Sequence, residues 1–283
     1  MLKVIKRKIL NLISKSGYRI ININPNDRNF LYEDKSDEEV LYLNIGAGSW
    51  YLPHWTNFDN PRPDYTKSLG HSKSLKESNI SFDLMSGDAW PIKDNSLNIV
   101  YSSHTIEHLN DKFTLELMKQ AHKKLKPGGI IRLTCPDIDV LLDAYKRKDE
   151  YVFKVCNTQP LNKPLKYSVH QSLLLYFAGE CSGFASNKIN ITDEEIQKEF
   201  KSLTNKDFLN KYSNMVSTEF VKNFPRDHKT WFNNEKVMEM LKLTGFKEVY
   251  KSSYCQSKSP ILRDPNFFDN THPDISLYVE AVK

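Results

Sequence analysis

A short apolar run that ends in two glycines constrains the fold of this 283-residue chain more than any other feature. The sequence LYLNIGAG, residues 41–48, is typical of a buried strand followed by a sharp turn. Glycine permits unusual backbone angles and lets a ligand approach the main chain. In open α/β sheets, ligands bind beyond the carboxyl ends of the strands, near the point where the strand order reverses. The turn therefore predicts a ligand site directly after the first strand of such a sheet.

The apolar runs that follow support this interpretation. Strands are expected at residues 40–45, 54–58, 80–84, 97–102, 130–134, 246–254 and 275–282, and helices at 111–125, 137–146 and 234–243. Asp111 is the expected N-cap of the first of these helices, and Pro127-Gly128-Gly129 is expected to turn the chain before the fifth strand. Strands that are apolar throughout and alternate with helices predict a parallel sheet covered on both faces.

The ends and the middle of the chain differ from this core. Residues 2–15 predict a basic amphipathic helix, and residues 1–19 carry six Lys and Arg residues and no acid. This helix either packs on the protein surface or contacts an anionic membrane surface or a lipid-linked substrate. We therefore divide the chain into a helix and linker at 1–39, a core at 40–150 and 226–283, and a helical insertion or lid at 151–225. Thr192 and Glu195 predict a capping box within the insertion.

Composition excludes several classes of protein. The four cysteines form no C-x-x-C pair, so neither a zinc knuckle nor a disulfide framework is indicated, and a reducing cytoplasmic setting is the simplest interpretation. No apolar stretch approaches the roughly 18–20 residues of a membrane span, and no secretory signal is evident. The net charge of +5 is too small to indicate nucleic-acid binding by itself.

A carboxylate follows the second expected strand. Asp59 could accept hydrogen bonds from both ribose hydroxyls of an adenosine. However, Tyr51 stands where the dinucleotide fingerprint has its third glycine, and Asp59 comes only 11 residues after Gly48. In the dinucleotide fold the acid follows about 20 residues after the turn. The spacing therefore argues against a nicotinamide dehydrogenase and predicts that any helix between the first two strands is short or absent.

Four motifs in order, LNIGAG, FD, DNSLNIVYSSHTIEHL and LKPGGIIRLTCPD, carry a resemblance to a known family. Together they resemble the class I S-adenosylmethionine-dependent methyltransferases of the type 11 group, in particular those of bacterial surface-polysaccharide biosynthesis. The resemblance covers about residues 40–137 and returns weakly after residue 228. It implies a Rossmann-like three-layer α/β sandwich. The sheet would be seven-stranded and mostly parallel, with an antiparallel last strand, and the insertion would be helical.

The resemblance also implies the cofactor, S-adenosyl-L-methionine, and the residues that bind it. The glycine turn would pass under the methionine and ribose, Asp59 would hold the ribose, and Asp83 with Leu84 would lie against the adenine. Asp88 is a rival for the adenine contact. Asn44 stands where the family usually has an acid, so its contact with the cofactor's amino group would lack charge. The complete expected set is Asn44, Gly46, Ala47, Gly48, Asp59, Asp83, Leu84, Ser102 and Ser103.

Histidines and acids after the later strands are the candidates for catalysis. His104 to His108 match the zinc-protease pattern H-x-x-E-H, but this pattern begins at a strand end inside the cofactor-binding order, so we expect no metal. His104 comes first after the strand and is the preferred general base. His228 and Asp137 are further catalytic candidates. We expect Glu107, His108, His170 and Trp231 to face the substrate, although each could instead serve the structure alone.

The resulting hypothesis is methyl transfer from S-adenosylmethionine, with O-methylation favoured. The acceptor would be a sugar or another small precursor of a bacterial surface polysaccharide, such as capsule or lipopolysaccharide. The protein would be cytoplasmic, with peripheral contact at the inner face of the membrane through residues 1–19 as an option. Two alternatives stay open: an RNA or other nucleic-acid methyltransferase, and a non-catalytic cofactor-binding scaffold. A nucleic-acid partner is not favoured, and the sequence leaves the oligomeric state open.

Overall fold

The computed structural model describes residues 41–48, 50, 52–60, 79–156, 159–184 and 189–283, together with residues 13, 15–16 and 29–32. The chain divides into two compact units, residues 1–33 and 34–283, which are described separately. In the first unit, the backbone N–H of Tyr32 donates to the carbonyl of Asn29. The basic helix expected over residues 2–15 and the linker up to residue 39 lie almost entirely outside the described residues. Within the described parts, no helix has the length and apolar character needed to cross a membrane.

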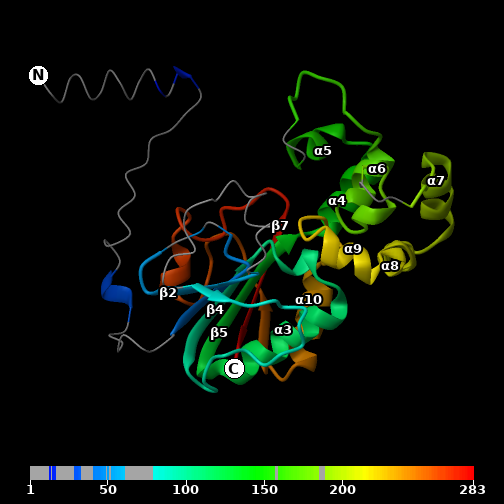
Figure 1. The fold of residues 1–283 in the computed structure, drawn as a ribbon. Helices are drawn as coiled ribbons and strands as arrows, with labels where there is room; N and C mark the ends of the chain where they lie inside the picture. The colour runs from blue at the N-terminus through cyan, green and yellow to red at the C-terminus, as the bar shows by residue number, and fades with distance from the viewer. Residues whose placement is uncertain are drawn as a thin grey trace, which may run out of the picture. The chain divides into compact units, whose positions relative to one another are not determined.

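A seven-stranded sheet forms the centre of the second unit (Figure 1), with the strand order β3-β2-β1-β4-β5-β7-β6. Its strands are β1 (Tyr42–Ile45), β2 (Trp55–Asp59), β3 (Asn79–Ser81), β4 (Leu97–Ser103), β5 (Leu125–Pro136), β6 (Glu248–Lys251) and β7 (Ser276–Val282). The pairs from β3 through β5 are parallel, and β7 is antiparallel to both β5 and β6. The predicted α/β fold, mostly parallel with an antiparallel last strand, is confirmed.

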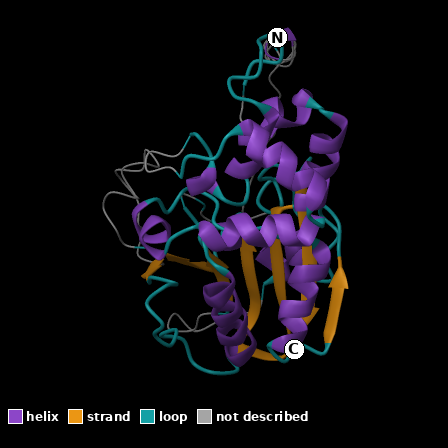
Figure 2. Ribbon diagram, turned by 90° about the vertical axis from the view of Figure 1, so that its right-hand side faces the viewer, coloured by secondary structure: helices purple, strands orange, loops and turns teal. Residues whose placement is uncertain are grey.

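One face of the sheet is covered by two helices, α3 (Asp111–Lys124) and α10 (Asn234–Leu243). Figure 2 shows purple helices lying over the orange strands. Alternate strand residues such as Leu43, Val100 and Ile131 are fully buried here and pack with Leu117 and Leu241 of the helices. This spacing follows from the strand period of two and the helix spacing of three to four residues. The largest apolar core of the described chain lies between these layers.

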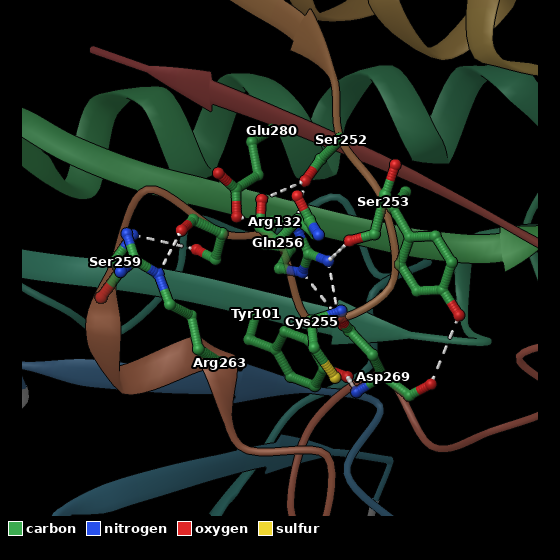
Figure 3. Close-up of polar contacts among 12 residues, drawn as sticks. Tyr101, Arg132, Ser252, Ser253, Cys255, Gln256, Ser259, Arg263, Asp269 and Glu280 are labelled. Atoms are coloured by element: carbon green, nitrogen blue, oxygen red, sulfur yellow. Dashed lines mark hydrogen bonds and ion pairs between the residues drawn. The ribbon is translucent and has the colours of Figure 1, made fainter.

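The opposite face of the sheet is aromatic and charged. Arg132 of β5 is fully buried, and all five N–H groups of its guanidinium have partners (Figure 3). Its Nε and Nη2 donate to both carboxylate oxygens of Asp269 (3.0 and 2.5 Å), and its Nη1 donates to Glu280 of β7 (2.8 Å) and to Ser252 (2.9 Å). Nη2 also donates to the carbonyl of Ser253 (2.8 Å). These bonds hold the connection between β6 and β7 against the sheet. The connection includes the 3-10 helix η4 (Pro260–Arg263).

A second apolar core lies among helices that follow β5 in the chain. Its residues come from α4 (Ile138–Arg147), α5 (Glu150–Cys156), α6 (Val169–Leu175), α7 (Asp193–Ser202) and α8 (Asn205–Met215), with the 3-10 helix η3 (Gly179–Cys181), and α9 (Thr218–Asn223) follows α8. Figure 1 shows them, green to yellow, beyond the carboxyl end of β5. The capping box of Thr192 and Glu195 is present at the start of α7, as predicted. The division of the chain at residues 151 and 225 stays a prediction.

Three local expectations differ from the structure. Asn110, not Asp111, caps α3, because its side chain accepts from the N–H of Phe113 (3.1 Å) and the helix begins one residue later. The residues Pro127-Gly128-Gly129 do not separate α3 from β5. They form an irregularity inside the strand, where the pairing shifts from Leu97–Leu125 to Ile99–Ile130. The third strand, expected over 80–84, is the shorter β3, and no helix is assigned among the described residues between β1 and β2.

Candidate active site

A cavity of about 650 Å³ lies at the carboxyl ends of the parallel strands. β1 and β4 are neighbours in the sheet, so the strand order reverses here, which is where α/β sheets bind ligands. Eight of the expected cofactor residues line the cavity: Asn44, Gly46, Ala47, Gly48, Asp59, Asp83, Leu84 and Ser103. Ser102 does not line it, because its side chain is buried and its Oγ donates to the carbonyl of Ile45 (3.2 Å). Asp88 does not line it either and is exposed.

The two glycines of the turn serve different purposes. Both have left-handed backbone angles, with φ of +68° at Gly46 and +55° at Gly48. A Cβ added at Gly46 would lie 2.1 Å from Oγ1 of Thr105, whereas a Cβ added at Gly48 would meet no protein atom within 4 Å. The first glycine is therefore required by the packing of the protein. The second leaves room at the wall of the cavity.

Asp59 joins the end of β2 to the glycine turn. Its Oδ2 accepts the backbone N–H of Gly48 (2.6 Å), and its Oδ1 accepts the N–H of Asn60 (2.7 Å). Burial raises the pKa of this carboxyl above its ordinary value, although these two hydrogen bonds lower the pKa in part. A carboxylate has about four lone-pair sites, so both oxygens can still accept hydroxyl donors from a ligand.

The lining of this cavity fits the adenosine and amino-acid parts of S-adenosylmethionine. Its volume lies within the range of about 300–1,000 Å³ that is usual for small-molecule sites. Phe82, Leu84 and Met85 supply an apolar wall for a base, and Asp59 supplies acceptors for ribose hydroxyls. Asn44, at the end of β1, brings an amide to the same cavity.

A buried carboxylate and three histidines lie beside this cavity. Glu107, in the 3-10 helix η2 (Ile106–His108), is 2% exposed. Its Oε1 lies 3.2 Å from Nδ1 of His104 and 3.9 Å from Nε2 of His108. The rings of His108 and His228 contact each other edge to face, with centroids 4.9 Å apart. Burial raises the pKa of Glu107, but the neighbouring histidines, His104 above all, outweigh burial and bring the pKa to about 2.

The backbone at His104 is strained, with φ of +50° directly after β4. Non-glycine residues held in this region are uncommon, and they gather at functional sites. Nε2 of His104 lies 2.8 Å from Oγ of Ser276, and Nδ1 faces Glu107. The hydroxyl of Ser276 also reaches the carbonyls of His272 (2.7 Å) and Thr271 (3.2 Å). Ser276 therefore has other partners available if His104 turns to a ligand.

A second cavity, of about 250 Å³, lies next to the first. His104 and Arg226 line both cavities, whereas His228, Tyr176 and His272 line only the smaller one. His228 is an expected site residue that is distant in sequence from the other expected residues that line the cavities. It comes from the loop after α9, and its ring contacts His108 of η2 here.

Besides Ser102 and Glu107, three expected site residues line neither cavity. Asp137 caps α4, where its side chain accepts the N–H of Asp139 (3.1 Å). His170 of α6 is 2.6 Å from the hydroxyl of Tyr145 through its Nδ1. Trp231 belongs to the second apolar core, and its Nε1 donates to Asn210 (3.0 Å). In these positions Asp137 caps a helix, and His170 and Trp231 contact residues of the helical region. None of the three takes part in the proposed mechanism.

Sequence reasoning missed the parts of the wall that come from distant segments. Phe267, Asn270 and Thr271 line the larger cavity from the connection between β6 and β7, and Val221 and Arg226 line it from α9 and the loop that follows. No motif or strand end marks these residues. The one local signal was Thr105, which directly follows His104 and packs against Gly46.

Comparison with known proteins agrees with this geometry. Residues 63–133, about a quarter of the chain, match the family model described as a methyltransferase domain, type 11. A search of curated proteins gives no match.

Among solved structures, the chain is similar to an S-adenosylmethionine-dependent methyltransferase from Mesorhizobium loti, with 13% identity over 92% of this chain and 98% of that chain and a TM-score of 0.40. A methyltransferase from Archaeoglobus fulgidus gives 14% identity, 91% coverage of each chain and a TM-score of 0.40. Human N-acetylserotonin methyltransferase gives 12% identity over 92% of this chain and 52% of that chain, with a TM-score of 0.36. All three TM-scores are below 0.5, so these likenesses add no weight to the assignment.

The assignment depends on the family match, the strand order, the glycine turn and the carboxylate after β2. Together these make the core of the chain similar to class I methyltransferase domains and give S-adenosylmethionine as the cofactor of the site.

Proposed function

We propose that the protein transfers the methyl group of S-adenosylmethionine to a hydroxyl of a small acceptor. The larger cavity would hold the cofactor and the smaller cavity the acceptor. The observation that carries this proposal is the position of His104, which lines both cavities. Its left-handed backbone angle supports a functional role for this position.

When bound, the cofactor supplies an already activated methyl group on its sulfonium. The chain must then orient the acceptor, exclude water and receive the hydroxyl proton. Glu107 is the positioning residue, because its Oε1 lies 3.2 Å from Nδ1 of His104 and favours the tautomer with the proton on Nδ1 and the lone pair on Nε2. An acceptor hydroxyl would replace Ser276 at Nε2 and give its proton to that nitrogen.

The acceptor class we propose is a sugar or a small precursor of a bacterial surface polysaccharide. The motif resemblance supports this choice, and the size of the smaller cavity suits a single sugar ring better than a nucleic acid. A cytoplasmic site of action and contact of residues 1–19 with a membrane surface belong to the same proposal.

The test is turnover with methyl-labelled S-adenosylmethionine against a panel of nucleotide sugars and lipid-linked glycans. His104→Ala should lower kcat by about 10²- to 10⁴-fold, which is the usual contribution of a positioned general base. The Kd of the cofactor should change by less than about threefold, because the base acts on the acceptor. His170→Ala, a histidine outside both cavities, is the matched control and should keep wild-type kcat.

Two results would overturn the proposal. If no acceptor in the panel is methylated while the cofactor binds normally, sugar O-methylation is wrong. If His104→Ala keeps the wild-type kcat on an acceptor that is methylated, His104 is not the base.

A further inference from the structure

Three potential metal ligands converge at the junction of the two cavities. A carboxylate oxygen of Glu107 and one ring nitrogen each of His108 and His228 all lie within 4.8 Å of one another. We infer that Glu107, His108 and His228 form a binding site for one divalent first-row transition-metal ion, for which Zn²⁺ is the best probe.

The backbone fixes which ring nitrogens are free. Nδ1 of His108 lies 3.1 Å from the carbonyl of Asp227, and Nδ1 of His228 lies 3.0 Å from the carbonyl of Tyr176. A carbonyl oxygen only accepts, so each Nδ1 must carry the proton. In a neutral ring the lone pair is then on Nε2. Metal-binding histidines are held in this way, with the second nitrogen donating to a carbonyl or carboxylate.

The charges of the three groups also favour a cation. Glu107 offers carboxylate oxygens and each imidazole offers one nitrogen, and divalent transition-metal ions bind both donor types. No hydrogen bond to Oε2 of Glu107 is recorded within the described residues, although this carboxylate is almost fully buried. A negative charge and two lone pairs therefore face one another. A buried charge of this kind is costly unless it is paired or coordinates a metal.

The geometry is close to that of a coordinated ion. Zn²⁺ bonds to nitrogen and oxygen at about 2.0–2.2 Å, so two ligand atoms of a tetrahedral site are about 3.3–3.6 Å apart. The three ligand atoms lie within 4.8 Å of one another, so they would need to approach by up to about 1.5 Å. Two histidines and one glutamate form a known catalytic zinc set, and three protein ligands leave a coordination position open.

The site differs from the one that the pattern H-x-x-E-H suggests. That pattern pairs His104 with His108 on one helix, but Nε2 of His104 is engaged with Ser276. The second imidazole comes instead from His228, in a distant loop, so the motif alone does not predict this set of ligands. His108 lines the larger cavity and His228 the smaller one. An open coordination position there could polarise the acceptor hydroxyl, a role that depends on the proposed methyl transfer, although the binding site itself does not.

The test is metal binding by the full-length protein, with no acceptor present. The protein is stripped with a chelator, dialysed and titrated with ZnCl₂ in a calorimeter, and bound zinc is counted by elemental analysis. We expect one equivalent of Zn²⁺ with a Kd in the micromolar range or below. His228→Ala and Glu107→Gln should each weaken binding by at least about 100-fold, beyond the 10- to 100-fold effect of outer-shell partners. His122→Ala, a histidine of α3 that contacts Phe246, is the control and should bind as the wild type does.

Co²⁺ provides a second readout that does not depend on variant stability. Bound to the wild-type chain, Co²⁺ should give visible absorption bands of a four- or five-coordinate ion, and one equivalent of Zn²⁺ should abolish them. Absence of stoichiometric Zn²⁺ binding to the wild type would overturn the inference, as would equal binding by a folded His228→Ala variant. If zinc binds but no acceptor is methylated, the metal site stands and the proposed function fails. If chelated protein methylates an acceptor and does not bind zinc, the proposed methyl transfer stands and the metal site fails.

Discussion

At the glycine turn, a methyl group added at Gly46 and one added at Gly48 would meet different surroundings. Gly46→Ala would place its Cβ against Thr105, and Gly48→Ala would place it in open space, although both would hold alanine at a positive φ. The left-handed angle alone costs roughly 1–2 kcal/mol, and overpacking adds about 1–3 kcal/mol. We therefore expect Gly46→Ala to lower the free energy of unfolding by about 2–5 kcal/mol and Gly48→Ala by about 1–2 kcal/mol.

The two glycine variants should also differ in their affinity for the cofactor. Gly48→Ala remains folded but narrows the cavity, so its Kd for S-adenosylmethionine should rise at least about tenfold. Urea unfolding and calorimetric titration of both variants check the two effects. Equal destabilisation by the two substitutions would contradict the assignment of separate purposes, and unchanged affinity in Gly48→Ala would remove this glycine from the cofactor site.

At the scale of elements, the connection between β6 and β7 depends on Arg132. This segment supplies Phe267 and Asn270 to the cavity, and Asp269 within it is bound by the buried guanidinium. Arg132→Met would leave the carboxylates of Asp269 and Glu280 buried without their cation. Removing one partner of a buried pair typically costs about 3–5 kcal/mol. We expect that loss in unfolding free energy, together with weaker cofactor binding in the fraction that folds.

The matched control is Arg147→Met on α4. Arg147 is also paired with acids, Asp143 at 2.9 Å and Asp149 at 3.7 Å, but its side chain is 60% exposed. Exposed pairs contribute about 0–1 kcal/mol, so this variant should unfold almost as the wild type does. Similar destabilisation by the two arginine substitutions would show that the buried cluster does not hold the connection.

The elements that sequence reasoning predicted well are those whose signals are local. β1 and β4 are apolar runs bounded by polar residues, and α7 begins at a capping box, so each could be read from neighbouring residues. The course of β5 depended instead on its partner, because Leu97 pairs with Leu125 before the glycines and Ile99 pairs with Ile130 after them. The cap of α3 was misplaced by one residue because Asn110 and Asp111 are both good caps.

The dependence on local signals also explains which site residues could be predicted from the sequence. Asp59 ends β2 and His104 directly follows β4, so parallel pairing alone brings them to one edge of the sheet. The meeting of His228 with His108 depends on how α9 and its following loop return to the sheet, and the wall at Phe267 depends on the Arg132 cluster. Neither arrangement has a periodic or compositional signal in the chain.

At the scale of the whole molecule, the cofactor cavity is built from three separate parts. The strand ends, the loop after α9 and the connection between β6 and β7 all contribute to its wall, through residues such as Asp59, Arg226 and Phe267. A ligand that contacts all three parts binds only the folded state, so it should stabilise the entire unit. At a concentration of 100 Kd the gain is about 2.7 kcal/mol, and for a protein of this size each kcal/mol raises Tm by roughly 2–4 °C. S-adenosylmethionine or S-adenosylhomocysteine should therefore raise Tm by about 5–10 °C.

Asp59→Asn provides the test of where this stabilisation comes from. Because burial raises the pKa of Asp59 above its ordinary value of 3.8, ionisation of this carboxyl opposes folding, and its contribution to stability is lost as pH rises through the folded-state pKa. The amide of Asp59→Asn would remove the cost of ionisation but could accept only one of the two backbone N–H groups, so the unliganded variant should unfold near the wild-type Tm at pH 7.5. Its cofactor-dependent shift should nearly vanish, because the amide lacks the charge that we propose holds the ribose hydroxyls. In the wild type the shift should shrink as pH falls toward the raised pKa, and this decline should begin above the range of an exposed aspartate. Scanning calorimetry with and without cofactor between pH 7.5 and 4.5 measures both effects, and a full shift in Asp59→Asn would show that the cofactor does not bind through β2.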